Sequence, residues 1–257
     1  MQAGSGSSIV GLWDCRCLTT SLLKMFFVYG DNIVGVFFTR GVLAIVLVQI
    51  LAYLLSIAIA VQPLQFADGY PVAFVPILFS LKPALYSYSL ITSAFLHSGL
   101  LHLVGNIMFF LAFGKTLERL LGTLSFLGAY LLLGAMGFLG SWLISADSTV
   151  PIVGSSGAVA FLMGAYLVLF PQARLKAIFT IPPFYKRFGV RAYVFVLVWA
   201  VLQVFSVGDE LEGKASVAYA THLLGFCIGL AAAACWKEFA TDTEARIANV
   251  YELRGYK

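Results

Sequence analysis

Charged side chains are scarce in this chain. Of its 257 residues, 16 are Lys or Arg and 12 are Asp or Glu, so that only 11% are charged. A soluble globular domain carries about 25% charged residues, and disordered chains, coiled coils and nucleic-acid-binding proteins also depend on many charges. Hydrophobic residues instead make up 61% of the chain, and the mean hydropathy is +0.94. The composition excludes those classes and predicts an integral membrane protein.

Cysteine is also rare, with Cys15, Cys17, Cys227 and Cys235 as the four residues. Four cysteines are too few for a disulfide framework, and the spacing of Cys15 and Cys17 is not that of a zinc knuckle. Cys227 and Cys235 lie in apolar sequence, where a thiol usually behaves as a small hydrophobic side chain. We therefore expect buried or unpaired thiols and no metal site.

Six apolar stretches approach or exceed the length that crosses a bilayer, which is about 20 helical residues. They cover residues 41–61, 96–113, 123–144, 150–170, 190–207 and 215–236. Residues 25–38 are also apolar but are short and contain Asp31, which favours an interfacial helix or loop. Residues 70–88 contain Pro71, Pro76 and Pro83, which interrupt helical hydrogen bonding and favour a membrane-associated first loop.

The sequence thus predicts an all-α, polytopic fold of six transmembrane helices. Residues 1–40 are expected to form a cytoplasmic or interfacial N-terminal segment, residues 41–236 the membrane domain, and residues 237–257 a cytoplasmic tail. The first residues lack the ordered basic region, apolar core and cleavage site of a signal peptide.

Basic residues are divided very unevenly between the two sides of this topology. One side holds 14 of the 16 Lys and Arg residues. Because cytoplasmic loops are enriched in Lys and Arg, this division predicts that both termini are cytoplasmic. The cytoplasmic set is Arg16, Lys24, Arg40, Lys115, Arg119, Arg174, Lys176, Lys186, Arg187, Arg191, Lys237, Arg246, Arg254 and Lys257, and the outer set is Lys82 and Lys214.

All three histidines lie in or at the mouth of predicted spans. They are His97, His102 and His222. An ionisable side chain in a bilayer is costly and usually faces a protein interior or a water-filled cavity, so each is a functional candidate. The alternative for each is a simple interhelical hydrogen bond. His97 would lie about 140° around the helix from His102, so we expect it to support a loop or the outer wall.

Ser156 and His222 are expected at one depth in the membrane. Both of their spans begin at the outer face, and a rise of ~1.5 Å per residue puts the two side chains about 9–11 Å below it. Ser156 lies in the string Gly154-Ser155-Ser156-Gly157. Glycine permits close approach, and a helix N-terminus offers unpaired N–H groups to an oxyanion. The same string also fits an ordinary N-cap.

Small residues predict a close contact between the fourth and sixth spans. Gly225 and Gly229 form a small-xxx-small face, and Gly157 and Ala160 are candidate partners. Gly225 is one turn from His222, so this packing would bring the imidazole against the fourth span. His102 and Asn106, four residues apart on the second span, share a face and can both donate hydrogen bonds to an oxyanion.

Taken together, these segments resemble the rhomboid family of intramembrane serine proteases. The resemblance rests on His97-Ser98-Gly99-Leu100-Leu101-His102-Leu103-Val104-Gly105-Asn106, Gly154-Ser155-Ser156-Gly157, and Ala220-Thr221-His222-Leu223-Leu224-Gly225 with Gly229. Gly114-x-x-x-Glu118-x-x-x-Gly122 also looks like the family's short cytoplasmic-loop motif. The match covers about residues 40–236.

The resemblance implies a Ser–His dyad without an aspartate. Ser156 would be the nucleophile and His222 the general base, with the Ser156 N–H, His102 and Asn106 holding the oxyanion. His97, Gly154, Gly157, Gly225, Gly229 and Glu118 would give structural support. The family cleaves transmembrane or membrane-proximal segments near the outer face and uses no metal or cofactor. The implied partners are transmembrane protein substrates and the lipid bilayer, in a prokaryotic cell membrane.

Two positions depart from the family pattern. The Trp-Arg pair that many members carry in the first loop is replaced by Tyr88-Ser89, and the aromatic residue expected four positions after the nucleophile is Ala160. Two other readings stay open: a non-catalytic rhomboid-like protein that binds or escorts membrane helices, and a transporter in which histidines relay protons. The spans contain no acidic partner for the histidines, which argues against the transporter.

Overall fold

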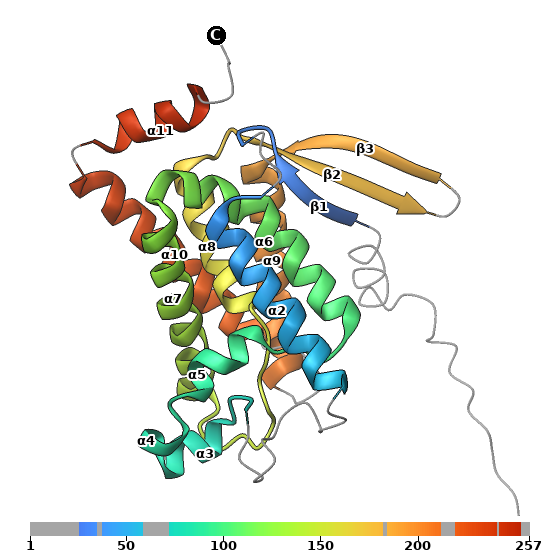
Figure 1. Ribbon diagram of the computed structural model, residues 1–257, viewed down its shortest axis with the longest axis vertical. Coiled ribbons are helices and arrows are strands. Elements are labelled where there is room, and N and C mark those ends of the chain that lie inside the picture. The colour runs from blue at the N-terminus through green and yellow to red at the C-terminus, as the bar shows by residue number, and fades with distance from the viewer. Residues whose placement is uncertain are drawn as a thin grey trace, which may run out of the picture.

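Six apolar helices form the body of the computed structural model, which describes residues 26–34, 38–58, 72–181, 184–211, 219–240 and 242–252 (Figure 1). Four of these helices are long and apolar enough to cross a membrane: α2 (Arg40–Ala58), α6 (Leu100–Leu121), α7 (Thr123–Ile144) and α10 (Tyr219–Phe239). The other two, α8 (Ser156–Leu169) and α9 (Ala192–Leu211), contain shorter apolar stretches. The chain is therefore a mostly helical integral membrane protein.

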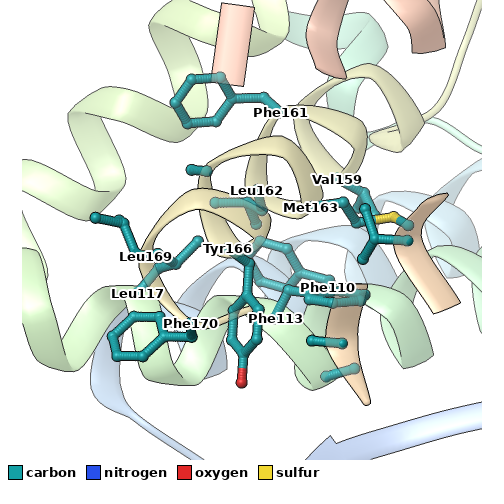
Figure 2. Close-up of a cluster of buried hydrophobic side chains, with 14 of the residues drawn as sticks. Phe110, Phe113, Leu117, Val159, Phe161, Leu162, Met163, Tyr166, Leu169 and Phe170 are labelled. Atoms are coloured by element: carbon teal, nitrogen blue, oxygen red, sulfur yellow. The ribbon is translucent and has the colours of Figure 1, made fainter. Parts of the chain in front are cut away.

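Helix α8 lies at the centre of the core. It packs against α6, α7, α9 and α10, and nearly all of its side chains are buried. Figure 2 shows Phe110 and Phe113 of α6 beside the side chains of α8, and the ring centres of Phe113 and Tyr166 are 5.2 Å apart. The helix ends at Leu169 because Pro171 disfavours helical backbone at Phe170. It has only 14 residues because it begins at Ser156, so the expected helix over 150–170 is wrong at its start, where residues 150–155 are non-helical.

The first loop consists of short helices rather than one span-length helix. They are α3 (Pro76–Leu81), α4 (Pro83–Tyr86) and α5 (Ser89–Thr92), followed by a 3-10 turn, η1 (Ser93–Phe95). Pro76 and Pro83 occupy first-turn positions, where a missing N–H leaves no helical bond unmade. Aromatic contacts join the loop to α7: Phe74 lies 5.7 Å from Phe138, and Phe79 lies 5.5 Å from Trp142, between ring centres.

A three-stranded antiparallel sheet corrects the all-α prediction. Its strands are β1 (Phe26–Asp31), β2 (Arg174–Ile181) and β3 (Phe184–Arg191), in the order β1-β2-β3. The interfacial helix or loop expected over residues 25–38 is therefore wrong where β1 forms. In β2, buried Leu175 and Ala177 alternate with Arg174 and Lys176, which is the period of a strand with one buried face. The sheet and α11 (Thr243–Glu252) lie at the end of the bundle opposite α3 and α4 (Figure 1).

Asp31 attaches β1 to the helices. Its side chain is 2% exposed and accepts hydrogen bonds from the hydroxyl groups of Thr116 on α6 and Tyr166 on α8. Its other oxygen accepts from the N–H groups of Ile33 and Val34, each at 3.1 Å. Asp31, which interrupts an apolar stretch in the sequence, therefore holds β1 against α6 and α8 in the fold. Each of these hydrogen bonds satisfies a buried donor group.

Glu118, near the end of α6, caps the N-terminus of α2. Its carboxylate accepts hydrogen bonds from the N–H groups of Gly41 at 2.7 Å and Val42 at 2.8 Å. The hydroxyl groups of Thr39 and Thr123 donate to it as well. A carboxylate here satisfies orphan donors of α2 and interacts favourably with the positive end of the helix dipole.

We expect Glu118→Ala to lower the free energy of unfolding by about 2–3 kcal/mol, because it leaves buried N–H groups without an acceptor. Thermal unfolding in detergent micelles measures the effect. Glu118→Gln, which keeps one acceptor oxygen, should lose less. Equal unfolding midpoints for Glu118→Ala and the unaltered protein would show that the cap contributes nothing.

Candidate active site

A cavity of about 810 Å³ lies between the helices, and its lining contains all of the sequence-predicted catalytic and oxyanion residues. Its lining includes His102 and Asn106 from α6, Ser156 from α8, and Trp199 and His222 from α9 and α10. Pro76 of α3 also lines it, so the cavity reaches the end of the bundle that carries the first loop. Ser156 and His222 both keep partial exposure. Water can therefore reach a serine and an imidazole in a protein whose helices are otherwise apolar.

Ser156 is the first residue of α8, and the chain reaches it through a strained turn. Gly154 has φ +116°, a backbone conformation that L side chains rarely adopt. Its N–H donates to the carbonyl of Ser93 in η1 at 2.9 Å, so the first loop holds the turn. Ser155 is the N-cap and is 1% exposed. Of the two adjacent serines, it is therefore Ser156 whose side chain lines the cavity.

The predicted depth of Ser156, about 9–11 Å below the outer face, is wrong in its basis. That depth follows from a helix that starts at residue 150, whereas α8 starts at Ser156, so no helical rise separates Ser156 from the start of the helix. What brings Ser156 to the level of His222 is the packing of α8 on α10.

Glycines bring the backbones of α8 and α10 into direct contact. A Cβ added to Gly225 would lie 2.4 Å from the carbonyl oxygen of Gly157 and 3.5 Å from Ala160. A Cβ added to Gly157 would lie 2.9 Å from Thr221, and one added to Gly229 would lie 2.1 Å from the carbonyl oxygen of Phe161. Gly157 follows Ser156 and Thr221 precedes His222, so the contact is made by the immediate neighbours of the two candidate residues.

His102 and Asn106 face the turn that precedes Ser156. A Cβ added to Gly154 would lie 2.8 Å from both Cε1 and Nε2 of His102 and 3.7 Å from Nδ2 of Asn106. Nδ1 of His102 is 3.1 Å from the Ser98 hydroxyl, and the Asn106 amide donates to the His102 carbonyl at 3.0 Å. The hydrogen bond at Nδ1 leaves Nε2 on the Gly154 side of the ring.

His97 and Glu118 lie outside the cavity lining. Helix α6 begins at Leu100, so His97 is not on the helix and the expected angle of 140° around it is wrong. His97 is 4% exposed, and its ring packs edge-on against His102 with 5.1 Å between ring centres. The expectation that it supports the wall remains, with His102 as the group it supports. Glu118 acts as the cap of α2 described above.

Two residues of α9 contact His222 and are absent from the sequence-based set. Nδ1 of His222 lies 2.7 Å from Oε1 of Gln203, and the ring of Trp199 lies 6.1 Å from the imidazole with the planes 35° apart. The sequence does mark Gln203 as a candidate for a functional residue, because it is a polar amide within an apolar span, and Trp199 lies one helical turn before it. Nothing local to either residue indicates that it meets His222.

Comparison with known proteins identifies the family. None of the curated proteins compared with the chain matches it. The family model of the rhomboid domain matches residues 85–238, which is more than half of the 257 residues and includes every residue of the cavity named above except Pro76. The chain therefore belongs to the rhomboid family.

Proposed function

We propose that this rhomboid-family protein is an intramembrane serine endopeptidase that cleaves transmembrane or membrane-proximal segments near the outer face. Ser156 attacks the scissile carbonyl, and His222 takes the hydroxyl proton and returns it to the leaving amine. The observation that carries the proposal is that Ser156 and His222 line one cavity while their immediate neighbours, Gly157 and Thr221, are in contact.

The oxyanion is stabilised by donors on two helices. The N–H of Ser156 belongs to the first turn of α8, where backbone donors have no partner within the helix. Nε2 of His102 and the second amide hydrogen of Asn106 supply side-chain donors from α6. Support comes from the position of both side chains against Gly154, two residues before the nucleophile.

The charge distribution supports an active site that opens to the outer face. Strands β2 and β3 carry Arg174, Lys176, Lys186, Arg187 and Arg191 and lie at one end of the bundle, whereas α3 and the cavity lie at the other. Because basic segments favour the cytoplasmic side, the cavity end is the outer one. In this arrangement α2, α6, α7, α8, α9 and α10 are the six spans.

Cleavage of a model transmembrane substrate in proteoliposomes tests the proposal. The expected products are two fragments, and mass spectrometry should place the cut near the outer end of the substrate helix. Substrates with Gly or Pro near the cut should be cleaved faster than the same helices with Leu there, since a helix must unwind locally to expose a carbonyl. A cut near the cytoplasmic end would contradict the proposed topology.

The alternative is a non-catalytic rhomboid that binds or escorts membrane helices. Substrate that co-purifies with the protein and stays intact in the same assay would favour it. The presence of both Ser156 and His222 in one water-accessible cavity favours the peptidase, since binding alone needs neither side chain.

A further inference from the structure

Helix α9 presents an amide to Nδ1 of His222. Oε1 of Gln203 lies 2.7 Å from Nδ1 of His222. Gln203 is 6% exposed, so this amide is held in the protein interior rather than in water. A buried amide that directs its oxygen at a ring nitrogen restricts the imidazole in a way that an apolar neighbour cannot.

This contact determines which nitrogen of His222 carries the proton. An amide oxygen can only accept a hydrogen bond, so Nδ1 must be the protonated nitrogen of the neutral ring. Nε2 is then unprotonated and has the lone pair that a general base needs. A carboxylate would fix the same tautomer, but an unpaired buried carboxylate is more costly between apolar helices than a neutral amide.

The same face of α9 also supplies an aromatic neighbour. Trp199 is four residues before Gln203, and its ring lies 6.1 Å from that of His222. Ala160, where an aromatic residue was expected, instead lies against Gly225 and allows α8 and α10 to approach. The imidazole is thus confined by two residues of α9, one through its ring face and one through Nδ1.

We infer that Gln203 is a positioning residue that fixes the tautomer and orientation of His222 for its reaction with Ser156, an inference that rests on the proposed peptidase function. During attack, the Ser156 proton passes to Nε2 of His222 while Nδ1 keeps its own proton, donated to Gln203. The imidazolium then gives the Nε2 proton to the leaving amine, and the ring returns to its starting tautomer. Gln203 gains and loses no proton in the cycle.

Three variants of α9 test the inference kinetically. Gln203→Leu should lower kcat by about 100-fold with KM changed by less than about twofold, because the base is left in the wrong tautomer and orientation. Gln203→Glu should retain most of the activity, and the acid limb of its kcat/KM profile should move to higher pH because a carboxylate stabilises the protonated imidazole. Ser206→Ala is the matched control and should leave kcat unchanged, since within the described part of the chain the Ser206 hydroxyl bonds to the Leu202 carbonyl of its own helix and to no other group.

Other titratable groups near the ring do not produce this pattern. Among the described residues, His102 on α6 and Tyr219 on α10 face His222, and neither carries a carboxylate or an amide oxygen that could replace Gln203. A Gln203→Leu variant with the kcat of the unaltered protein, or a Gln203→Glu variant with an unmoved acid limb, would overturn the inference.

Nitrogen NMR of the imidazoles separates failure of this inference from failure of the proposed function. At alkaline pH, where the rings are neutral, His222 should be in the Nδ1–H tautomer in the unaltered protein and should lose that preference in Gln203→Leu. The resonances are assigned by their loss in His222→Ala. This result requires no peptidase activity, so a protein that cleaves nothing but shows the tautomer change would refute the peptidase and keep the contact. If the protein is an active peptidase and Gln203→Leu leaves the tautomer of His222 unchanged, the result would refute the role of Gln203 and leave the proposed function intact.

Discussion

Replacing Ser156 by alanine should reduce cleavage of a transmembrane substrate by about 1,000-fold or more. The expected loss is large because the hydroxyl is the atom that forms the covalent intermediate, and removing one member of a nucleophile–base pair disables the other. Cleavage rates of reconstituted protein, measured by the appearance of fragments, give the value. Binding of the substrate should remain close to normal, since the cavity loses one oxygen atom and no wall.

The neighbouring serine provides a matched control. Ser155 is buried at the N-cap of α8, whereas Ser156 lines the cavity. The Ser155 side chain makes no capping hydrogen bond, so Ser155→Ala should change stability little and should keep a cleavage rate within about tenfold of the unaltered protein. If Ser155→Ala inactivated the protein and Ser156→Ala stayed active, the nucleophile would be Ser155 and the proposal would be wrong.

Gly225→Ala should damage both stability and catalysis. The new Cβ would lie 2.4 Å from the Gly157 carbonyl oxygen, and because this atom belongs to the backbone of α8 the two helices must separate. Overpacking of this kind lowers the free energy of unfolding by about 1–3 kcal/mol. A shift of about 1 Å between nucleophile and base can lower the rate by about 100-fold. Thermal unfolding and cleavage rates on the same preparation measure the two effects.

Gly128→Ala on α7 is the control for this substitution. None of the described residues lies within 4 Å of a Cβ added to Gly128, so this variant should fold with equal or slightly higher stability and cleave normally. A Gly225→Ala variant that matched Gly128→Ala in both measurements would mean that α8 and α10 do not need their backbone contact.

The membrane helices and the catalytic and oxyanion candidates that line the cavity could be predicted from the sequence because both depend on local patterns. Apolar length indicates a span directly, and Gly225 near His222 indicates which face of α10 meets a partner. The limits of α8 were harder to predict, since Gly154 and Pro171 shorten a stretch whose mean hydropathy is high enough for a span. An average over about 20 residues does not register a turn made by a few of them.

Contacts between distant segments explain what the sequence did not reveal. The sheet was missed because β2 and β3 are basic and the alternation of Leu175 and Ala177 is short, so a cytoplasmic loop fitted equally well. Asp31 interrupts an apolar stretch in sequence, yet its partners Thr116 and Tyr166 come from two other segments. The same holds for Gln203, because whether its amide reaches His222 depends on how α9 is rotated against α10.

Covalent labelling by a fluorophosphonate or chloroisocoumarin probe tests the central claim most directly. The proposal predicts that the probe labels Ser156 of the unaltered protein, identified by mass spectrometry, and that labelling falls by about 100-fold or more in His222→Ala because the hydroxyl loses its base. Labelling of Ser156 that is equal in the presence and absence of the His222 imidazole, or no labelling of Ser156 in the folded protein, would contradict it.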